Sequence, residues 1–249
     1  MKKDIQIILP AYNEEACIGA FLSKLKNSSL LDNADVLVIN DASTDNTSSI
    51  VKNLQIPMLN HPYNLGYGAA LQSGYKYAVA KDYQYLIQID SDGQHDICNI
   101  ERIYQQLTKE GNPPDLVIGT RFHKDSQSFP ISWPKKIAIR FFRRFIKITS
   151  KRNITDPTSG LQGMNRKVFE YYSHFDNFDT NYPDANMIVQ MALLGYNIQE
   201  IPAVMHAREG GTSMHFGIIE PILYMFIMVF STANVYIRSK KRGRKVSES

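Results

Sequence analysis

The sequence predicts an α/β fold in which a mostly parallel central sheet carries helices on both faces. Short apolar runs rich in Val, Ile and Leu alternate with longer amphipathic stretches four times in the first 120 residues. These runs stop at clusters of polar residues, which is typical of strands that end at the ligand-binding edge of a parallel sheet. At 249 residues and 43% hydrophobic content, the chain is long enough to bury one sizeable core.

The first strand is expected at residues 5–9, because this apolar run stops at Pro10. An amphipathic helix follows it to about Asn27. The same reasoning predicts further strands at 35–40, 56–60, 83–89 and 116–119. The other helices are expected around Ile50 and Val51, from Asn64 to about Ala80, and at 97–110, 133–148, 184–194 and 216–237, the last being an apolar C-terminal helix.

The segment Leu86–His95 carries the clearest chemical signal in the chain. An apolar run ends there in Asp90 and Asp92, followed by a glycine and Gln94. Mg²⁺ usually takes one or two protein carboxylates together with the phosphates of its substrate, so this arrangement indicates a metal-bound diphosphate. A plain turn is the alternative, since Asp, Ser and Gly all favour turns. Polar clusters at the other expected strand ends favour the metal site: residues 12–14, residues 41–45 and Arg121.

A Gly-x-Gly pair at Gly66 and Gly68 could be mistaken for a dinucleotide-binding motif. The third glycine of that motif is missing, and the first strand is not followed by a Gly-rich turn. A nicotinamide cofactor is therefore not expected, and the same absence argues against a nucleotidyltransferase. We expect the two glycines to allow close packing at the start of a helix.

The formal charge of +4 is unevenly distributed along the chain. Residues 238–249 form a basic tail with six Lys or Arg and one Glu, so the rest of the chain is nearly neutral. A second basic block lies between Trp133 and Arg152, with eight Lys or Arg and no acid. No base-stacking aromatics accompany the tail, so no nucleic-acid partner is expected. Two cysteines without metal-ligand spacing suit a reducing cytosol.

Eight short segments combine into a specific pattern: Pro10–Glu15, Asn40–Asp45, Asn64–Gly66, Asp90–Gln94, Gly119–Arg121, Asp156–Leu161, Gly195–Pro202 and Arg208–Ser213. In order and spacing this set resembles the family 2 glycosyltransferases, and most closely their polyprenol-phosphate (dolichol-phosphate) mannosyltransferase-like branch. The resemblance implies a GT-A fold over residues 1–215, with a nucleotide-sugar half at 1–122 and an acceptor half at 123–215. It also implies an inverting transfer of one sugar from a UDP- or GDP-sugar.

The same resemblance implies roles for residues on the donor side. The donor-binding set would be Pro10, Tyr12, Glu14, Asp41, Asp90 and Arg121, and the metal ligands would be Asp90, Asp92 and Gln94. The expected cofactor is Mg²⁺ or Mn²⁺. Physical reasoning agrees with a metal, because a cation beside the diphosphate stabilises the charge that develops on the leaving group.

The acceptor side is expected to contain Asp184 and Arg208 as catalytic residues. Many relatives carry Thr-Glu-Asp where this chain has Tyr-Pro-Asp, and Asp184 keeps the carboxylate of the family base. An N-cap of the 184–194 helix is the alternative role for Asp184. Arg208 lies in a Gly-rich segment that would contact the donor diphosphate or an acceptor phosphate, because a guanidinium matches phosphate geometry. A surface salt bridge is the alternative for Arg208 and for Arg121.

Two segments suggest contact with a membrane. Residues 133–148 mix bulky apolar residues with cations, which suits a helix on an anionic lipid surface. The alternative is an ordinary helix that packs Phe141, Phe145 and Ile148 on the core. Residues 216–237 are apolar but interrupted by polar residues, and the basic tail follows them. We expect a peripheral or monotopic protein at the cytoplasmic face of the membrane, or a homo-oligomer formed through the C-terminal helix.

Three functions follow from these observations. The leading hypothesis is a metal-dependent inverting glycosyltransferase that moves a sugar to a lipid-linked acceptor, with polyprenyl phosphate as the first choice. The second is a cell-surface polysaccharide or glycolipid transferase that acts on a sugar hydroxyl with Asp184 as base. A non-catalytic membrane-binding scaffold is the alternative from another class.

Overall fold

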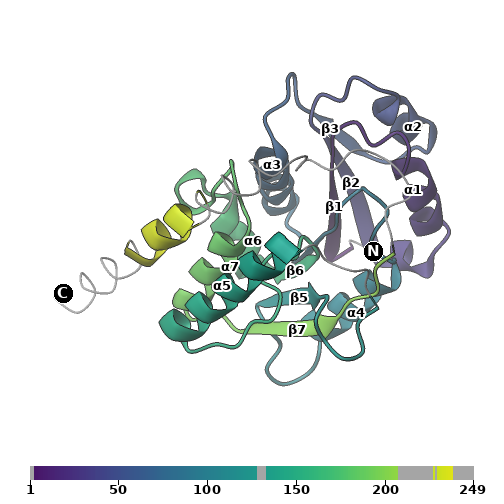
Figure 1. The fold of residues 1–249 in the computed structure, drawn as a ribbon. Helices are drawn as coiled ribbons and strands as arrows, with labels where there is room; N and C mark the ends of the chain where they lie inside the picture. Colours follow the sequence, from purple (N-terminus) through teal and green to yellow (C-terminus); the bar gives the residue numbers. More distant parts are fainter. Residues whose placement is uncertain (1–2, 128–132, 207–226, 228, 238–249) are drawn as a thin grey trace.

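The computed structural model describes residues 3–127, 133–206, 227 and 229–237. Within these residues one sheet has the strand order β3-β2-β1-β4-β6-β5-β7 (Figure 1). Strand β6 is antiparallel to both of its neighbours, and the other pairs are parallel. The strands are β1 (Ile5–Ala11), β2 (Ala34–Asn40), β3 (Met58–Asn60), β4 (Tyr85–Gln88), β5 (Leu116–Thr120), β6 (Gln162–Asn165) and β7 (Ile198–Pro202).

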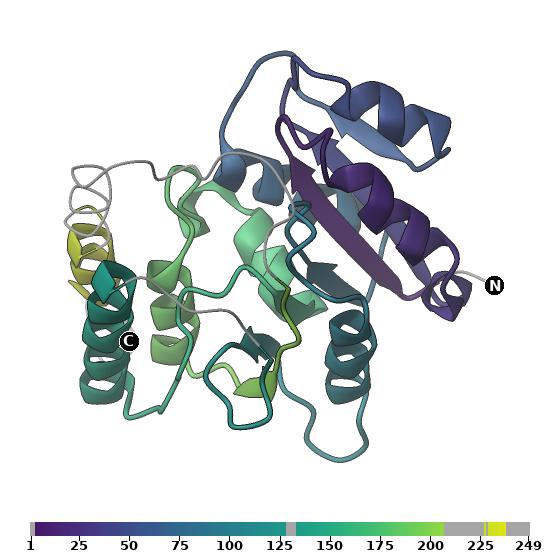
Figure 2. The same cartoon turned by 45° about the vertical axis from the view of Figure 1, so that its right-hand side comes forward.

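Helices cover both faces of the sheet, as Figures 1 and 2 show from two directions. Helices α1, α2 and α4 pack on one face, and α3, α5, α6 and α7 contribute to the core on the other. Their bounds are α1 (Ile18–Lys26), α2 (Thr47–Asn53), α3 (Tyr67–Ala80), α4 (Cys98–Leu107), α5 (Trp133–Ser150), α6 (Arg166–Ser173) and α7 (Ala185–Leu193), with short 3₁₀ turns at Ser29–Asp32 and Phe175–Asn177.

Strand β1 shows why apolar runs form this sheet. Successive side chains of a strand point to opposite faces, and here both faces are covered. Ile8 belongs to the core on the α3 side, whereas Ile7 and Leu9 belong to the core on the α1 side, and all three are fully buried. A strand in this position must be apolar at nearly every residue, which is what the sequence run at 5–9 indicated.

The predicted mostly parallel sheet with helices on both faces is confirmed, with three differences. Pro10 belongs to β1 rather than to the loop after it. Strands β6 and β7 were not expected, and neither was α6. The sequence Gln-Gly-Met-Asn of β6 has no apolar run, and its strand conformation depends on pairing with β4 and β5.

One edge of the sheet collects the carboxyl ends of all the parallel strands. Because β6 runs in the opposite direction, it begins at this edge instead of ending there. The segment that precedes β6, Asp156–Leu161, is therefore brought to the same edge as the polar clusters after β1, β2, β4 and β5.

Helix α5 has two different faces. Phe142 and Ile146 are buried in the core, and Phe145 is partly buried. Phe141 and Ile148 are exposed, at 45% and 74%, so the alternative in which this helix packs both of them on the core is wrong for these two residues. The exposed residues of this helix include these two together with Lys136, Ile137, Arg140, Arg144 and Lys147.

The predicted C-terminal apolar helix lies largely outside the described residues. Residues 227 and 229–237 are helical, and in Figure 2 this yellow segment lies beside α5. Tyr236 contacts Phe145 of α5, with ring centroids 6.3 Å apart. Across the part of the chain that the structure describes, we find no helix with both the length and the apolar character needed to span a bilayer. The basic tail at 238–249 also lies outside the described residues.

Candidate active site

Two loops at the carboxyl edge, residues 12–15 after β1 and 41–47 after β2, are joined by hydrogen bonds. Each loop contains one residue with a left-handed backbone, Asn13 with a φ of 55° and Ala42 with a φ of 58°. Tyr12 stands exposed at their rim. The bonds are Asn13 N to Ser43 Oγ (3.0 Å), Glu14 N to Thr47 Oγ1 (2.8 Å), Glu15 N to Asp45 Oδ2 (3.0 Å), Thr44 N to Asn13 Oδ1 (2.8 Å) and Asn46 N to Glu15 Oε2 (2.9 Å).

Asp41, expected in the donor pocket, is buried and organises the backbone around it. Its Oδ1 accepts a hydrogen bond from Leu65 N and lies 2.7 Å from His61 Nδ1. Its Oδ2 accepts from Gly66 N, at 2.8 Å. Gly66 has a φ of 93°, which glycine adopts without strain. Asp41 therefore fixes the segment that starts α3, and its contact with a nucleotide stays a prediction.

Three hydrogen bonds hold the acidic loop after β4. Ser91 is buried, and its hydroxyl donates to the carbonyl of Pro10 at 2.7 Å. Asp92 Oδ1 accepts from Gln94 N at 3.0 Å, which closes a tight turn through Gly93. Asp90 Oδ1 accepts from the hydroxyl of Tyr67 at 2.9 Å. Both carboxylates are half-buried, and these contacts orient them before any ligand arrives.

Gly160, just before β6, leaves room for the Asp90 carboxylate because it has no side chain. A Cβ atom at this position would lie 2.5 Å from Asp90 Oδ2, closer than a van der Waals contact allows. The neighbouring Gln88 donates to the Gly160 carbonyl at 3.0 Å and fixes the close approach. This proximity exists because β6 begins at the carboxyl edge.

Asp184 follows a residue that packs beside the contact of Asp90: a Cβ atom at Gly68 would lie 2.9 Å from Pro183 Cδ, and the neighbouring Tyr67 donates to Asp90. Burial raises the pKa of the Tyr67 hydroxyl well above its usual value, and the charges of Asp90 and Asp184 oppose a phenolate there as well. The same two carboxylates also act on the Arg121 guanidinium. Tyr67 thus stays protonated at physiological pH and remains a hydrogen-bond donor to Asp90.

Arg121 is paired with a buried partner. Its Nε and Nη2 donate to the two carboxylate oxygens of Asp156 at 2.7 and 2.6 Å, and Nη2 also donates to Thr158 Oγ1 at 2.9 Å. Burial disfavours the charge, but these bonds outweigh it and the pKa of Arg121 lies above its ordinary value. Of the two alternatives for Arg121, the ion pair is present, although it is buried rather than at the surface. A contact with the diphosphate stays a prediction.

Asp184 occupies the position before α7, but its side chain makes no capping hydrogen bond. Asn186 Oδ1 accepts from the backbone N–H groups of Asp184 and Met187, both at 2.9 Å. The N-cap role that the sequence left open for Asp184 is therefore not what its carboxylate does.

The segment leading to Arg208 is attached to the acidic loop. His206 N donates to the carbonyl of Gln94 at 2.7 Å, and Asp96 N donates to that of Val204 at 3.1 Å. Arg208 itself lies outside the described residues, so its role stays a prediction. The last described residue of this segment nevertheless adjoins the acidic loop.

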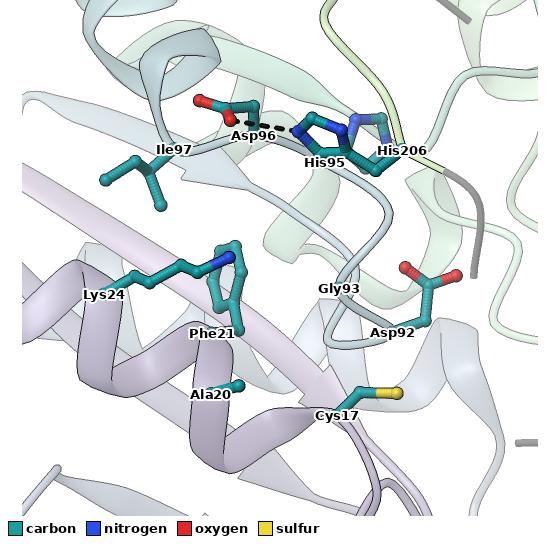
Figure 3. Close-up of a pocket in the computed structure, with 10 residues that line it drawn as sticks. All are labelled: Cys17, Ala20, Phe21, Lys24, Asp92, Gly93, His95, Asp96, Ile97 and His206. Atoms are coloured by element: carbon teal, nitrogen blue, oxygen red, sulfur yellow. Dashed lines mark hydrogen bonds and ion pairs between the residues drawn. The ribbon is translucent and has the colours of Figure 1, made fainter. Parts of the chain in front are cut away.

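A pocket of about 200 Å³ lies between α1 and the acidic loop (Figure 3). His95 lines it and is buried, and burial lowers the pKa of its imidazole to about 4. Its Nδ1 has no hydrogen-bond partner among the described residues. Also in the lining are Cys17, Phe21, Lys24, Asp92, Asp96 and His206.

Sequence reasoning assigned no role to several residues at this site. Gly160 lies inside a segment that the resemblance quotes and Tyr67 directly follows another, so their position was a usable signal, but nothing in the sequence reveals which carboxylate they contact. His95 and Asn186 carried no signal. Among the described residues, no group of three or more His, Cys, Asp or Glu side chains is arranged as a metal site. Two carboxylates suffice only where the substrate phosphates complete the coordination.

The mostly parallel sheet with helices on both faces is a GT-A-like fold, which solved glycosyltransferases share. Glucosyl-3-phosphoglycerate synthase from Mycobacterium tuberculosis, solved with Mn²⁺, uridine diphosphate and phosphoglyceric acid, superposes with a TM-score of 0.66. The match has 18% sequence identity and covers 94% of this chain and 78% of the other. The chain belongs to glycosyl transferase family 2, whose profile matches residues 6–173.

Two relatives carry names that refer to polyprenyl carriers. An undecaprenyl-phosphate mannosyltransferase from Micrococcus luteus is 26% identical over 218 residues, which are 84% of this chain and 86% of the relative. A dolichyl-phosphate hexose transferase from Haloferax volcanii is 24% identical over 212 residues, 85% of this chain and 86% of the relative. The expected resemblance to the polyprenol-phosphate branch is thus confirmed.

Proposed function

We propose that this family 2 glycosyltransferase transfers one sugar, with inversion, from a UDP- or GDP-sugar to a lipid-linked acceptor, polyprenyl phosphate being the first candidate. The observation that carries the proposal is the approach of the segment that carries Asp184 to Asp90: Pro183 packs against Gly68, and the adjacent Tyr67 donates to Asp90. A donor-side and an acceptor-side carboxylate would thus share one site. The two relatives named for polyprenyl carriers support the lipid-linked acceptor.

On the donor side, Asp90, Asp92 and Gln94 would hold Mg²⁺ or Mn²⁺. The set fits a hard cation, because it consists of oxygen donors on one turn and leaves coordination positions for a diphosphate. When bound, the cation would offset the negative charge of the leaving diphosphate. Tyr67 orients Asp90, and the turn at Gly93 orients Asp92. The base and ribose would lie along Pro10, Tyr12, Glu14 and Asp41, with Arg121 and Arg208 near the phosphates.

On the acceptor side, the requirement for a base depends on the nucleophile. A lipid phosphate is already an anion and attacks without losing a proton. A sugar hydroxyl must lose its proton as it attacks, and Asp184 would accept it. The second candidate function, a transferase acting on a sugar hydroxyl, is favoured by the Asp184 carboxylate being uninvolved in helix capping.

Asp184→Asn separates these two acceptors. If the acceptor is a phosphate, transfer to undecaprenyl phosphate should retain most of its rate, because no proton must be removed. If the acceptor is a hydroxyl, the rate should fall by about 10²- to 10⁴-fold, the usual contribution of a general base. Single-turnover transfer from a radiolabelled sugar nucleotide measures the difference, and Asp176→Asn on the neighbouring 3₁₀ turn is the matched control.

We also propose that α5 places the enzyme at the cytoplasmic face of a membrane as a peripheral protein. Its exposed face combines the apolar Ile137, Phe141 and Ile148 with cations, a composition that suits the interface of an anionic bilayer. The active site would then receive the head group of its acceptor without removing the lipid from the bilayer. An oligomer formed through the C-terminal helix is the other use we propose for the apolar surface.

A thermal-shift panel tests the donor proposal. UDP-, GDP-, TDP- and CMP-sugars are added with and without Mn²⁺. A donor at 100 times its Kd should stabilise the protein by about 2.7 kcal/mol, which is roughly 5–10 °C for a chain of this size. The shift should require metal and should disappear in Asp92→Asn. No metal-dependent shift with any UDP- or GDP-sugar would overturn the proposed donor class.

A non-catalytic membrane-binding scaffold with the same fold makes the opposite prediction. It would bind anionic vesicles through α5 but would show neither metal-dependent nucleotide binding nor hydrolysis of a sugar nucleotide. The presence of Asp90, Asp92 and Asp184 together favours the enzyme.

A further inference from the structure

Three side chains from distant parts of the chain form a closed ring of hydrogen bonds on the acceptor side. Asn186 Nδ2 donates to Asp179 Oδ2 at 2.9 Å and to Ser231 Oγ at 2.8 Å. Ser231 Oγ donates in turn to Asp179 Oδ2 at 2.9 Å. Asn186 is fully buried on α7, whereas Ser231 lies in the helical segment 229–237. This ring therefore connects the C-terminal helical segment to the start of α7.

The side-chain oxygen of Asn186 and the second carboxylate oxygen of Asp179 hold the loop that carries Asp184. Asn186 Oδ1 accepts from the backbone N–H of Asp184 at 2.9 Å. Asp179 Oδ1 accepts from the N–H groups of Asn181 and Tyr182, each at 3.1 Å. The ring thus controls both ends of the loop 179–184.

The opposite side of this loop packs on the donor half. A Cβ atom at Gly68 would lie 2.3 Å from the Thr180 carbonyl oxygen, so the loop backbone touches the first turn of α3. Tyr67, the preceding residue, donates to Asp90. The loop is therefore fixed between the donor-side carboxylate and the C-terminal helical segment.

We propose that Asp179, Asn186 and Ser231 are positioning residues that hold the whole loop 179–184 at a fixed distance from the donor site, where the loop orients a phosphate or a hydroxyl acceptor, so that the C-terminal helical segment is part of the acceptor site. This inference rests on the proposed function, in which Asp184 faces the acceptor. All three residues lie beyond the residues that match the family profile, so the profile does not account for them. Positions of reacting groups must hold to about 1 Å, and a larger error costs roughly 10²-fold in rate.

Ser231→Ala is the first test. It removes one hydroxyl from the ring and leaves the donor site untouched. We expect kcat for transfer to undecaprenyl phosphate to fall about 10- to 100-fold, with the Kd of the metal–nucleotide complex unchanged. The matched control is Thr232→Val, which removes the hydroxyl of the next residue, a buried group without a hydrogen-bond partner among the described residues. Amide hydrogen exchange at Asn181, Tyr182 and Asp184 should accelerate in Ser231→Ala and not in Thr232→Val.

A polarity swap gives the sharper test. Asp179→Asn alone loses the acceptor for Asn186 and Ser231, and Asn186→Asp alone places two carboxylates together, so each should lower kcat. In the double variant, the amide introduced at position 179 can donate to the carboxylate introduced at position 186 and to Ser231. Ser231 can then donate to that carboxylate, so every bond of the ring can form again. Transfer should return to within about threefold of wild type, as non-additive pairs in contact do.

The possible results distinguish a failure of the positioning role from a failure of the proposed glycosyltransferase function. If wild type transfers sugar and Ser231→Ala transfers at the same rate, the positioning role is wrong while the proposed function stands. It is also wrong if Thr232→Val has the same effect as Ser231→Ala, or if the folded double variant is no faster than the single ones. If wild type binds no UDP- or GDP-sugar in the presence of Mn²⁺, both the proposed function and this inference fail.

Discussion

Asp41 and Arg121 are charged residues of the candidate site that the protein itself already holds in place. Asp41 accepts hydrogen bonds from two backbone N–H groups and contacts His61. Arg121 forms a bidentate ion pair with Asp156. Each such contact fixes a side chain before a substrate arrives, which reduces the entropy lost on binding. The resemblance to the family assigned both residues to the donor site but did not reveal their partners, which come from segments 20 to 35 residues away.

Gly160→Ala should impair the proposed metal site without unfolding the protein. Gly160 does not have a positive φ, so alanine fits the backbone, but its Cβ would displace the Asp90 carboxylate. Changes that disturb the orientation of a metal ligand usually cost 10- to 100-fold in metal affinity, and we expect a loss of about that size in Mn²⁺-dependent nucleotide binding by calorimetry. Gly19→Ala, whose Cβ would meet only Ile50 at 3.1 Å, is the control and should bind normally.

Arg121→Met should destabilise the fold, because it leaves the Asp156 carboxylate buried without its cation. Breaking a buried pair in this way costs about 3–5 kcal/mol, which urea denaturation would measure. Adding Asp156→Asn removes the stranded charge and should recover part of the stability. A stable Arg121→Met protein with weak nucleotide binding would instead show that the guanidinium serves mainly the donor.

His95 should make stability depend on pH in the weakly acidic range. Burial lowers the pKa of this imidazole to about 4 in the folded protein, against about 6.5 for an unfolded chain. Between these values the unfolded state binds more protons, so stability falls as the pH drops from about 6.5 to about 4. His95→Phe stays neutral and should show a smaller decrease in Tm over this range. Equal decreases in both proteins would contradict a buried neutral imidazole.

At the scale of elements, α5 combines a core-facing side with an outer face that is both apolar and basic. Its buried side holds Phe142 and Ile146, while Phe141 and Ile148 face outward between cations. The hydrophobic and basic composition was visible in the sequence. Which phenylalanines face the core was not, because the run contains apolar residues around most of the helix and either face could be buried.

Charge reversal on α5 should weaken binding to anionic membranes. Each Lys or Arg near such a surface contributes about 1 kcal/mol, so Arg140→Glu with Arg144→Glu should lower the partition coefficient at least about 30-fold. Co-sedimentation of the full chain with phosphatidylserine vesicles measures this, and the loss should shrink at high salt. Lys52→Glu on α2 is a matched control on the other face of the sheet. Equal binding by the wild type and the α5 variant would rule out this surface.

At the scale of the whole molecule, sequence reasoning succeeded where a strand is buried on both faces. Such strands are apolar along most of their length, and β1, β2, β4 and β5 were found for that reason. Strand β6 was not predicted, because Gln162 and Asn165 are residue types common in loops. Its strand conformation depends on pairing with β4 and β5. The same strand brings Gly160 to Asp90, so missing it also meant missing this contact.

The reversed direction of β6 also means that the long segment between β5 and β6 starts and ends at the same edge of the sheet. Strand β5 leaves the sheet at the functional edge and β6 enters it there, and Gly119 N bonds to the Leu161 carbonyl at 3.0 Å. Residues 122–155, which include α5, therefore form an excursion between Arg121 and Asp156, whose ion pair joins its two ends. An insertion or exchange within it need not disturb the sheet. Exchanges within residues 122–155 would change what approaches the proposed donor site, while the strands of the sheet and the loops after β1, β2 and β4 stay the same.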